Sequence, residues 1–214
     1  MTAAGMEPAA RVVARAFEMM RERGCRALTM DDLARDLGMS KKTLYVLVQS
    51  KEGLVERGIR EFVGQTEGAL GVVLDEPGLD FLARKERFFA TVFGRLGTLP
   101  PRLFHDLERE FPRLRGLIGE LRAEVLPKML GRLLAIGAAE GRVRPDVDAG
   151  LFCTVFLAGA NALLCPEMLD RFRLHPAEMA SRLARLMFDG VATRPLAPTE
   201  AEDLAGRRLG PEDD

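Results

Sequence analysis

The feature that most restricts the fold of this chain is the helical spacing of its apolar residues, which proline and glycine interrupt. No segment between turn signals shows the strict alternation typical of a β-strand, so the sequence predicts an all-α fold. Pro127 lies within the longest predicted helix and is expected to kink or split it, because proline removes a helical hydrogen bond. The longer helices are expected at residues 51–74, 79–96, 101–110, 112–140, 148–165 and 176–191.

Three shorter helices are predicted before residue 51. The second and third, near residues 30–37 and 41–48, follow Thr29 and Ser40, whose hydroxyl oxygens can accept a hydrogen bond from a free backbone N–H at a helix start. Gly38 lies in the connection between them, where glycine supplies a backbone conformation that side chains resist. Two short helices joined by so tight a turn are typical of a helix-turn-helix.

The segment 41–48 divides into an inward and an outward face. Leu44 and Val48 are four residues apart and can face the preceding helix, which leaves a polar set pointing outward: Lys41, Lys42, Thr43 and Tyr45. Lysines at a helix start oppose the helix dipole at a cost of up to about 1 kcal/mol, so another partner must favour them. The phosphates of a nucleic acid would stabilise these lysines. Lys51, which follows the predicted cap Ser50, would reach another phosphate farther along the nucleic-acid backbone.

The stretch GCRALTMDDLARDLGMSKKTLYVLVQSKEGLV, from Gly24 to Val55, resembles the DNA-binding segment of the TetR family of bacterial transcriptional regulators. The resemblance implies a double-stranded DNA operator as partner, with backbone contacts from Thr43, Tyr45 and Lys51 and with the two lysines at 41 and 42 near base edges. Val46 stands where many members carry a polar or aromatic residue. The bases would then be read either by Val46, through contact with a thymine methyl, or by Lys42, through the acceptors of guanine. The full expected set is Thr29, Ser40, Lys41, Lys42, Thr43, Tyr45, Val46 and Lys51.

The same resemblance implies a division of the chain. We expect a helix-turn-helix DNA-binding domain at residues 1–50 and a larger helical ligand-binding and dimerisation domain at 51–195. Residues 196–214 form a polar tail, rich in glycine, proline and acidic residues, that is expected to be mobile. The last two helices are expected to form a homodimer through a four-helix bundle, so the operator is expected to be a palindrome.

Eleven of the twelve phenylalanines lie beyond residue 60, where they line either a core or a pocket. The resemblance implies a ligand cavity in this part of the chain, and its apolar composition favours an apolar or amphipathic small-molecule effector. His105 and Asn161 are candidates for orienting the ligand, and the candidate wall residues are Phe62, Phe89, Phe93, Phe104, Met129 and Phe156.

Several other classes of protein fit the sequence poorly. Three widely spaced cysteines and two distant histidines match neither a disulfide framework nor a metal site, and no cofactor motif or catalytic set is apparent, so we expect neither metal nor cofactor and no enzyme. Arginines interrupt the apolar N-terminal residues, which excludes a signal-peptide core, and the apolar run at 149–166 is expected to be a buried helix rather than a membrane span. A cytoplasmic location is therefore expected, while a redox-sensing role for Cys153 or Cys165 stays open.

Some alternatives remain open. Gly64, Gly68 and Gly71 share one face of the predicted 51–74 helix, which provides either close packing and a pivot or simply a poorly stabilised helix. The leading interpretation is a homodimeric repressor that a small-molecule effector releases from its operator. The alternatives are a transcriptional activator and a dimeric binding module that uses the helix-turn-helix for protein contact and never touches DNA.

Overall fold

The computed structural model describes residues 7–191, and this range holds ten α-helices and no β-strand. The prediction of an all-α fold is therefore confirmed. The predicted tail at 196–214 lies outside the described residues. The helices, in chain order, are α1 (Pro8–Arg23), α2 (Met30–Asp36), α3 (Lys41–Val48), α4 (Lys51–Asp75), α5 (Phe81–Gly97), α6 (Pro101–Glu110), α7 (Pro112–Ala139), α8 (Ala149–Leu163), α9 (Pro166–Phe172) and α10 (Pro176–Val191).

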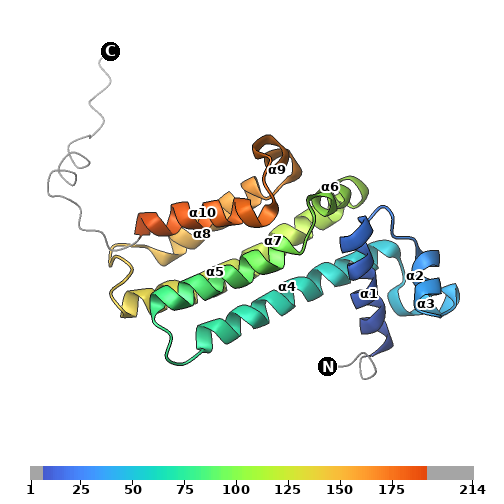
Figure 1. The fold of residues 1–214 in the computed structure, drawn as a ribbon, viewed down its shortest axis with the longest axis horizontal. Coiled ribbons are helices and arrows are strands. Elements are labelled where there is room, and N and C mark those ends of the chain that lie inside the picture. Colours follow the sequence, from blue (N-terminus) through green and yellow to red (C-terminus); the bar gives the residue numbers. More distant parts are fainter. Residues whose placement is uncertain (1–6, 192–214) are drawn as a thin grey trace, which may run out of the picture.

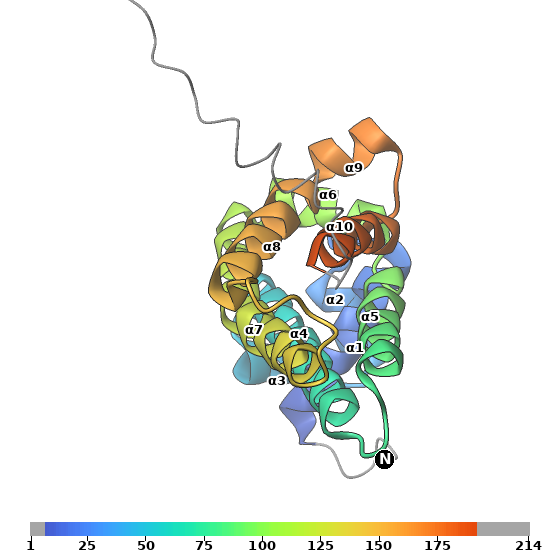
Figure 2. The same ribbon diagram turned by 90° about the vertical axis from the view of Figure 1, so that its left-hand side faces the viewer.

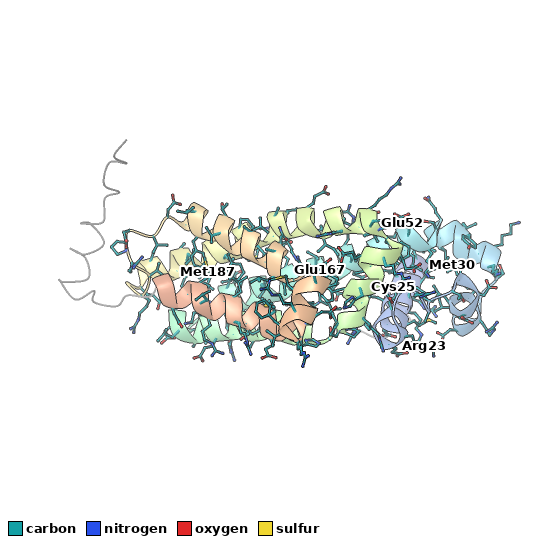
Figure 3. All side chains as sticks on the ribbon, turned by 90° about the horizontal axis from the view of Figure 1, so that it is seen from above. Arg23, Cys25, Met30, Glu52, Glu167 and Met187 are labelled. Atoms are coloured by element: carbon teal, nitrogen blue, oxygen red, sulfur yellow. The ribbon has the colours of Figure 1, made fainter. Side chains whose placement is uncertain are left out.

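The molecule is elongated, with the three short N-terminal helices gathered at one end (Figure 1). The long helices α4, α5 and α7 run along the body, and α8 and α10 lie beside each other on top of it (Figure 1). Seen from the far end, α4, α5, α7, α8 and α10 surround one common interior (Figure 2). From above, Arg23, Cys25 and Met30 lie at the end with the short helices, whereas Met187 lies at the opposite end (Figure 3).

The short helices begin where the sequence predicts. Thr29 and Ser40 accept hydrogen bonds from the backbone N–H groups of Asp32 and Thr43, at 3.1 and 3.0 Å, and Ser50 caps α4 in the same way. Gly38 has a φ of +65°, a left-handed conformation that side chains disfavour. Local hydrogen bonding and one glycine thus account for the helix-turn-helix geometry.

Two hydrophobic clusters hold the structure together. One packs α1, α2 and α3 against the start of α4, but it also takes in Leu103 and Leu107 of α6 and Leu117 of α7. The other fills the body between α5, α7, α8 and α10. Because α6 and the start of α7 belong to the first cluster, the helix-turn-helix is packed directly onto the body.

Proline behaves differently from the sequence prediction at two places. Helix α7 continues through Pro127 without a break, so of the predicted kink or split the split does not occur. Pro166 begins a helix, α9, that the sequence analysis does not predict, since proline is well suited to the first helical position, where no N–H is needed.

The apolar segment at 149–166 is buried on one face only. Phe152 and Phe156 of α8 are inside the body, whereas Leu151 and Val155 are 63% and 46% exposed. Among residues 7–191, no single helix is long and apolar enough to cross a membrane; α8 and α9 reach the required length and composition only as a pair bent by 78°.

The glycine face of α4 does not pack closely within the chain. No atom lies within 4 Å of a Cβ added at Gly64, Gly68 or Gly71, so the close-packing interpretation is wrong for contacts inside one chain. Close approach occurs instead at Gly58, where a Cβ would lie 2.9 Å from the Phe17 ring, and at Gly137 of α7.

These surroundings predict opposite effects for two glycine-to-alanine changes. Gly137→Ala is expected to lower the free energy of unfolding by about 1–3 kcal/mol, because its Cβ would lie 2.6 Å from Phe81 Cε2 and 2.7 Å from Val143 Cγ2. Gly64→Ala is expected to raise it by up to about 1 kcal/mol, since alanine favours the helix and meets nothing. Urea denaturation of both variants measures the difference, and equal shifts would contradict the packing at Gly137.

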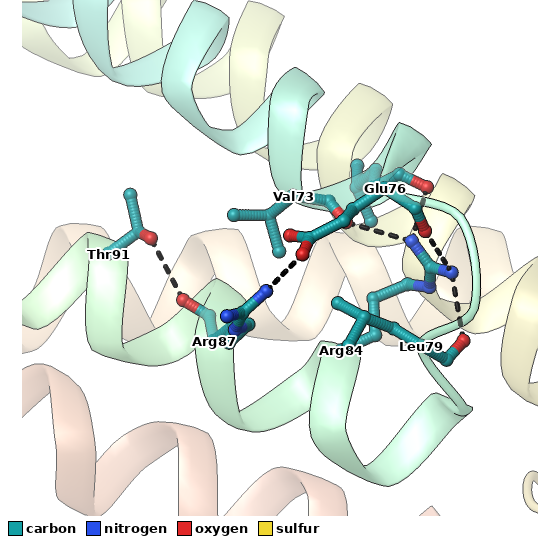
Figure 4. Close-up of polar contacts among 7 residues, drawn as sticks. Val73, Glu76, Leu79, Arg84, Arg87 and Thr91 are labelled. Carbon is teal, nitrogen blue, oxygen red and sulfur yellow. Dashed lines mark hydrogen bonds and ion pairs between the residues drawn. The ribbon is translucent and has the colours of Figure 1, made fainter.

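One buried arginine fixes the connection between α4 and α5. Arg84 is only 7% exposed, and its two terminal nitrogens donate to four backbone carbonyls (Figure 4). The acceptors belong to Val73, Leu74, Glu76 and Leu79, at 2.8, 2.7, 2.9 and 2.9 Å. A cation that bonds the last carbonyls of a helix also complements the helix dipole, so Arg84 stabilises the C-terminal end of α4.

Candidate DNA-binding surface and effector cavity

Helix α3 presents its predicted outward residues to solvent. Leu44 and Val48 are 0% and 1% exposed and anchor the helix on the N-terminal cluster, as predicted. The exposed face carries Lys41, Lys42, Thr43, Tyr45 and Val46, and the exposed fraction of Val46 reaches 75%. The structure therefore brings five of the eight predicted DNA-binding residues together on one protruding surface.

The two lysines of this surface differ in their surroundings. Lys41 forms an ion pair with Asp31 of α2. Lys42 is exposed and has no ion pair among the described residues. A phosphate that approaches Lys41 must compete with a carboxylate, whereas Lys42 is available without such competition.

The other three predicted residues are engaged within the chain. Thr29 accepts the α2 cap bond and donates from its hydroxyl to Asp32, at 2.6 Å. Ser40 caps α3 and lies 2.8 Å from the Thr43 hydroxyl. Lys51 is partly buried, with its ammonium group 5.9 Å from the centre of the Phe111 ring. Thr29 and Ser40 thus fix the starts of α2 and α3, and Lys51 lies at the margin of the exposed α3 surface.

An apolar cavity, called here the inner cavity, has a volume of about 190 Å³. It lies where the two hydrophobic clusters meet, because Met20 and Cys25 of the N-terminal end line it together with residues of the body. Five of the eight predicted ligand-binding residues line it, namely Phe62, Phe89, Phe93, Phe104 and Phe156. An occupant of the inner cavity would therefore touch the same cluster that holds the helix-turn-helix.

The remaining three predicted ligand-binding residues lie outside the inner cavity. Met129 is 2% exposed and packs within the body cluster. His105 points to α9, where its Nε2 is 3.3 Å from an Asp170 carboxylate oxygen. Asn161 is exposed and lines a second, more polar cavity of about 430 Å³, called here the outer cavity.

Two arginines that the sequence analysis does not single out line the inner cavity. Arg95 of α5 donates to the Thr66 hydroxyl at 2.6 Å and lies over the Phe62 ring. Arg122 of α7 lines both the inner and the outer cavity. A signal for Arg122 exists in the sequence, because it lies between Ile118 and Val125 on the apolar side of a predicted helix.

The three thiols do not show the surroundings of reactive cysteines. Burial raises the pKa of Cys25 to about 12, and burial also raises the pKa of Cys153 and of Cys165. All three are free, and a raised pKa keeps a thiol protonated and poorly nucleophilic at neutral pH. Within residues 7–191, no group of three or more His, Cys, Asp or Glu side chains could hold a metal ion.

Helix α6 connects the cavities with the end of α1. Leu103, Phe104 and Leu107 of α6 line the inner cavity. From the same helix, Arg102 donates to the Arg21 carbonyl at 3.1 Å and to the Glu22 carbonyl. One short helix thus touches both the cavity and the helix on which the helix-turn-helix is packed.

The fold and the exposed α3 surface define a helix-turn-helix DNA-binding protein with a helical body. Residues 12–57 match the model of the bacterial regulatory proteins of the tetR family. The chain is 24% identical over 185 residues to YvaF of Bacillus subtilis (strain 168), an uncharacterized HTH-type transcriptional regulator, with 85% of this chain and 94% of YvaF covered. The resemblance of the N-terminal segment to the TetR family of transcriptional regulators is thereby confirmed.

Solved structures of low sequence identity share the fold. The fatty acid degradation regulator FadR of Bacillus halodurans has a TM-score of 0.64 and 17% identity, with 88% of this chain and 99% of that chain covered. A TetR-family regulator of Marinobacter aquaeolei VT8 also has a TM-score of 0.64, with 19% identity and coverages of 94% and 98%. The ketosteroid transcriptional regulator KstR2 of Mycobacterium tuberculosis has a TM-score of 0.51 and 22% identity, with coverages of 90% and 100%. The family is one of transcriptional regulators, which are generally not enzymes.

Proposed function

We propose that this regulator is a cytoplasmic homodimeric repressor, which binds a palindromic operator through α3 and leaves it when a small apolar or amphipathic effector occupies the inner cavity. The observation that carries the proposal is the position of this cavity, between the cluster that anchors α3 and the cluster of the body. Regulators of this family bind DNA operators and small-molecule effectors and act as dimers.

The exposed residues of α3 support the DNA-binding part of the proposal. Lys42 would approach base edges or a phosphate, and the hydroxyl groups of Thr43 and Tyr45 would add neutral phosphate contacts that set the register. Val46, exposed at the centre of this face, would contact a thymine methyl. We propose that residues 1–50 form the DNA-binding domain and residues 51–195 the ligand-binding and dimerisation domain.

The apolar walls of the inner cavity support the proposed effector class. Among similar structures are a fatty acid degradation regulator and a ketosteroid transcriptional regulator, which is in keeping with an apolar ligand here. Contact of α6 with both the cavity and α1 offers a physical route by which occupancy would change the position of α3. An effector acts this way only if it binds the released state more tightly than the DNA-bound state.

Exposed apolar residues on α8 and α10 support the proposed dimer. Leu151 and Val155 of α8 and Leu186 of α10 are 63%, 46% and 75% exposed, on two helices that lie side by side (Figures 1 and 2). A second copy that covers them would build a four-helix bundle and would place the two α3 helices about 34–36 Å apart, one turn of DNA.

Val155→Glu with Leu186→Glu is expected to convert the dimer into a monomer, because four carboxylates would lose hydration inside the interface. The mass measured by light scattering after gel filtration tests this. Val72→Glu on α4 is the matched control, since Val72 is 70% exposed and lies away from α8 and α10. A double variant that stays dimeric at micromolar concentration would contradict this interface.

The direct test of the proposed function is a selection of genomic fragments by the purified protein at near-physiological salt, followed by sequencing. Enrichment of one palindromic site supports a specific operator. Weak retention of all sequences that disappears with added salt would reject it, because only phosphate contacts would then be present. That outcome would favour a dimeric module that uses α3 for protein contact.

A further inference from the structure

Arg122 of α7 lies at the boundary between two cavities of different character. The walls of the inner cavity are almost entirely apolar, whereas the outer cavity also has polar and charged side chains, among them Arg115, Asn161 and Cys165. Phe104, Leu107, Ile118, Arg122 and Leu164 line both. The two cavities therefore adjoin, and Arg122 is the charged side chain that they share.

The guanidinium group of Arg122 has no carboxylate partner among the described residues. Its one polar contact is from Nη1 to the Asn161 side-chain oxygen, at 3.3 Å. By contrast, Arg115 in the outer cavity is paired with Glu108 at 2.5 Å. Since an arginine carries five N–H donors, most of those of Arg122 have no acceptor among the described residues.

The position of Arg122 is costly for a cation. Burial lowers the pKa of Arg122 to about 10, which still leaves the side chain charged at neutral pH. A charge that is partly removed from water is destabilised unless it is paired and hydrogen-bonded. An anion from outside the chain would supply both the charge and the missing acceptors.

Arg95, the other arginine of the inner cavity, is already satisfied. Its donors reach the Thr66 hydroxyl, the Gln65 side-chain oxygen and the Phe62 carbonyl, at 2.6, 3.2 and 3.3 Å. Its guanidinium carbon lies 4.9 Å from the centre of the Phe62 ring. Arg122 is therefore the better anchor for an incoming anion.

We propose that the effector is an amphipath with an anionic head group, a carboxylate or a phosphate, that binds Arg122 while its apolar tail occupies the inner cavity. This inference rests on the proposed function, since it names the chemical class of the same effector. The inner cavity of about 190 Å³ is below the range of about 300–1,000 Å³ usual for small-molecule sites, and the outer cavity of about 430 Å³ adds the required space. A ligand that spans both cavities uses the apolar walls and the cation together.

Four probes with the same ten-carbon chain test this inference: decanoate, decyl phosphate, 1-decanol and decyltrimethylammonium. Their affinities for the full-length protein are measured by isothermal titration calorimetry. Decanoate or decyl phosphate is expected to bind at least about tenfold more tightly than 1-decanol, because the head group pairs with a partly buried cation. The tighter of the two anions identifies the head group.

Three variants assign the effect to Arg122. Arg122→Met is expected to weaken binding of the preferred anion by about tenfold and to leave 1-decanol within about twofold, which also shows that the cavity is intact. Arg122→Lys keeps the charge and is expected to retain most of the preference for an anion. Arg132→Met is the matched control on α7, where Arg132 pairs with Asp75 at 2.5 Å outside both cavities.

The inference is overturned if the neutral or the cationic probe binds as tightly as both anions, or if Arg122→Met leaves the preference for anions unchanged. Release of the selected operator is measured separately by fluorescence anisotropy. Anion binding through Arg122 without release would reject effector control and keep the ligand class, whereas release by 1-decanol alone would keep effector control and reject the anionic head group.

Discussion

Replacement of both Lys41 and Lys42 by glutamate is expected to lower operator affinity by more than about a hundredfold at near-physiological salt. In a dimer this change removes four cations from the α3 surfaces and adds four anions that repel phosphate. The folded state should persist, because both side chains are exposed. Fluorescence anisotropy with a labelled operator measures the affinity, and gel filtration reports whether the dimer survives.

Single changes should separate the two lysines. Lys42→Ala is expected to weaken binding more than Lys41→Ala, because Lys41 must give up its ion pair with Asp31 to contact DNA. Each lost phosphate contact should also reduce the slope of log affinity against log salt by about 1. Lys85→Glu with Lys128→Glu, on the body helices α5 and α7, makes the same change in net charge and should have little effect. An equal loss in this control would mean that overall charge, rather than the α3 surface, governs binding.

Arg84→Met is expected to lower the free energy of unfolding by about 3 kcal/mol, the largest stability effect among the changes considered. Methionine fills much of the volume but donates to none of the four carbonyls that Arg84 bonds. The last turn of α4 would lose acceptor partners and a cation near its dipole. Chemical denaturation at a fixed protein concentration measures the change.

Two companion variants identify what Arg84 contributes. Arg84→Lys keeps the charge but places three donors on one nitrogen, so it should recover less than half of the loss. Arg87→Met removes the ion pair with Glu76, and because the Arg87 side chain is 55% exposed the loss should stay within about 0.5 kcal/mol. Full recovery by lysine would show that the charge alone, and not the forked hydrogen bonding, stabilises this end of α4.

Local signals account for the parts of the structure that the sequence predicts well. Thr29, Ser40 and Ser50 cap helices through bonds to residues three positions away, so neighbouring residues suffice to locate the helix-turn-helix. Leu44 and Val48 are similarly assigned to the buried face by spacing alone. The helix that begins at Pro166 is missing from the prediction because proline can either end one helix or begin another, and the residues that follow it decide between the two.

The cavity depends on information that one sequence does not contain. Whether an apolar side chain points into the cavity or into the surrounding core depends on the rotation of its helix against several others. Phe89 and Met129 are both buried in the body, yet only Phe89 lines the inner cavity. His105 could not be placed because its partner, Asp170, lies on the unpredicted helix α9.

The hydrogen bonds of Arg84 hold the C-terminal end of α4 against the start of α5. Helix α4 has 25 residues and is about 37 Å long. Its other end begins at Lys51, directly after α3. A tilt of about 5° at the held end would displace the Lys51 end by about 3 Å. In a dimer, such a tilt of both α4 helices would change the separation of the two α3 helices by up to about 6 Å, whereas successive major grooves are about 34 Å apart. If an effector in the inner cavity tilted α4 by this amount, both α3 helices would be misaligned with the grooves of the DNA.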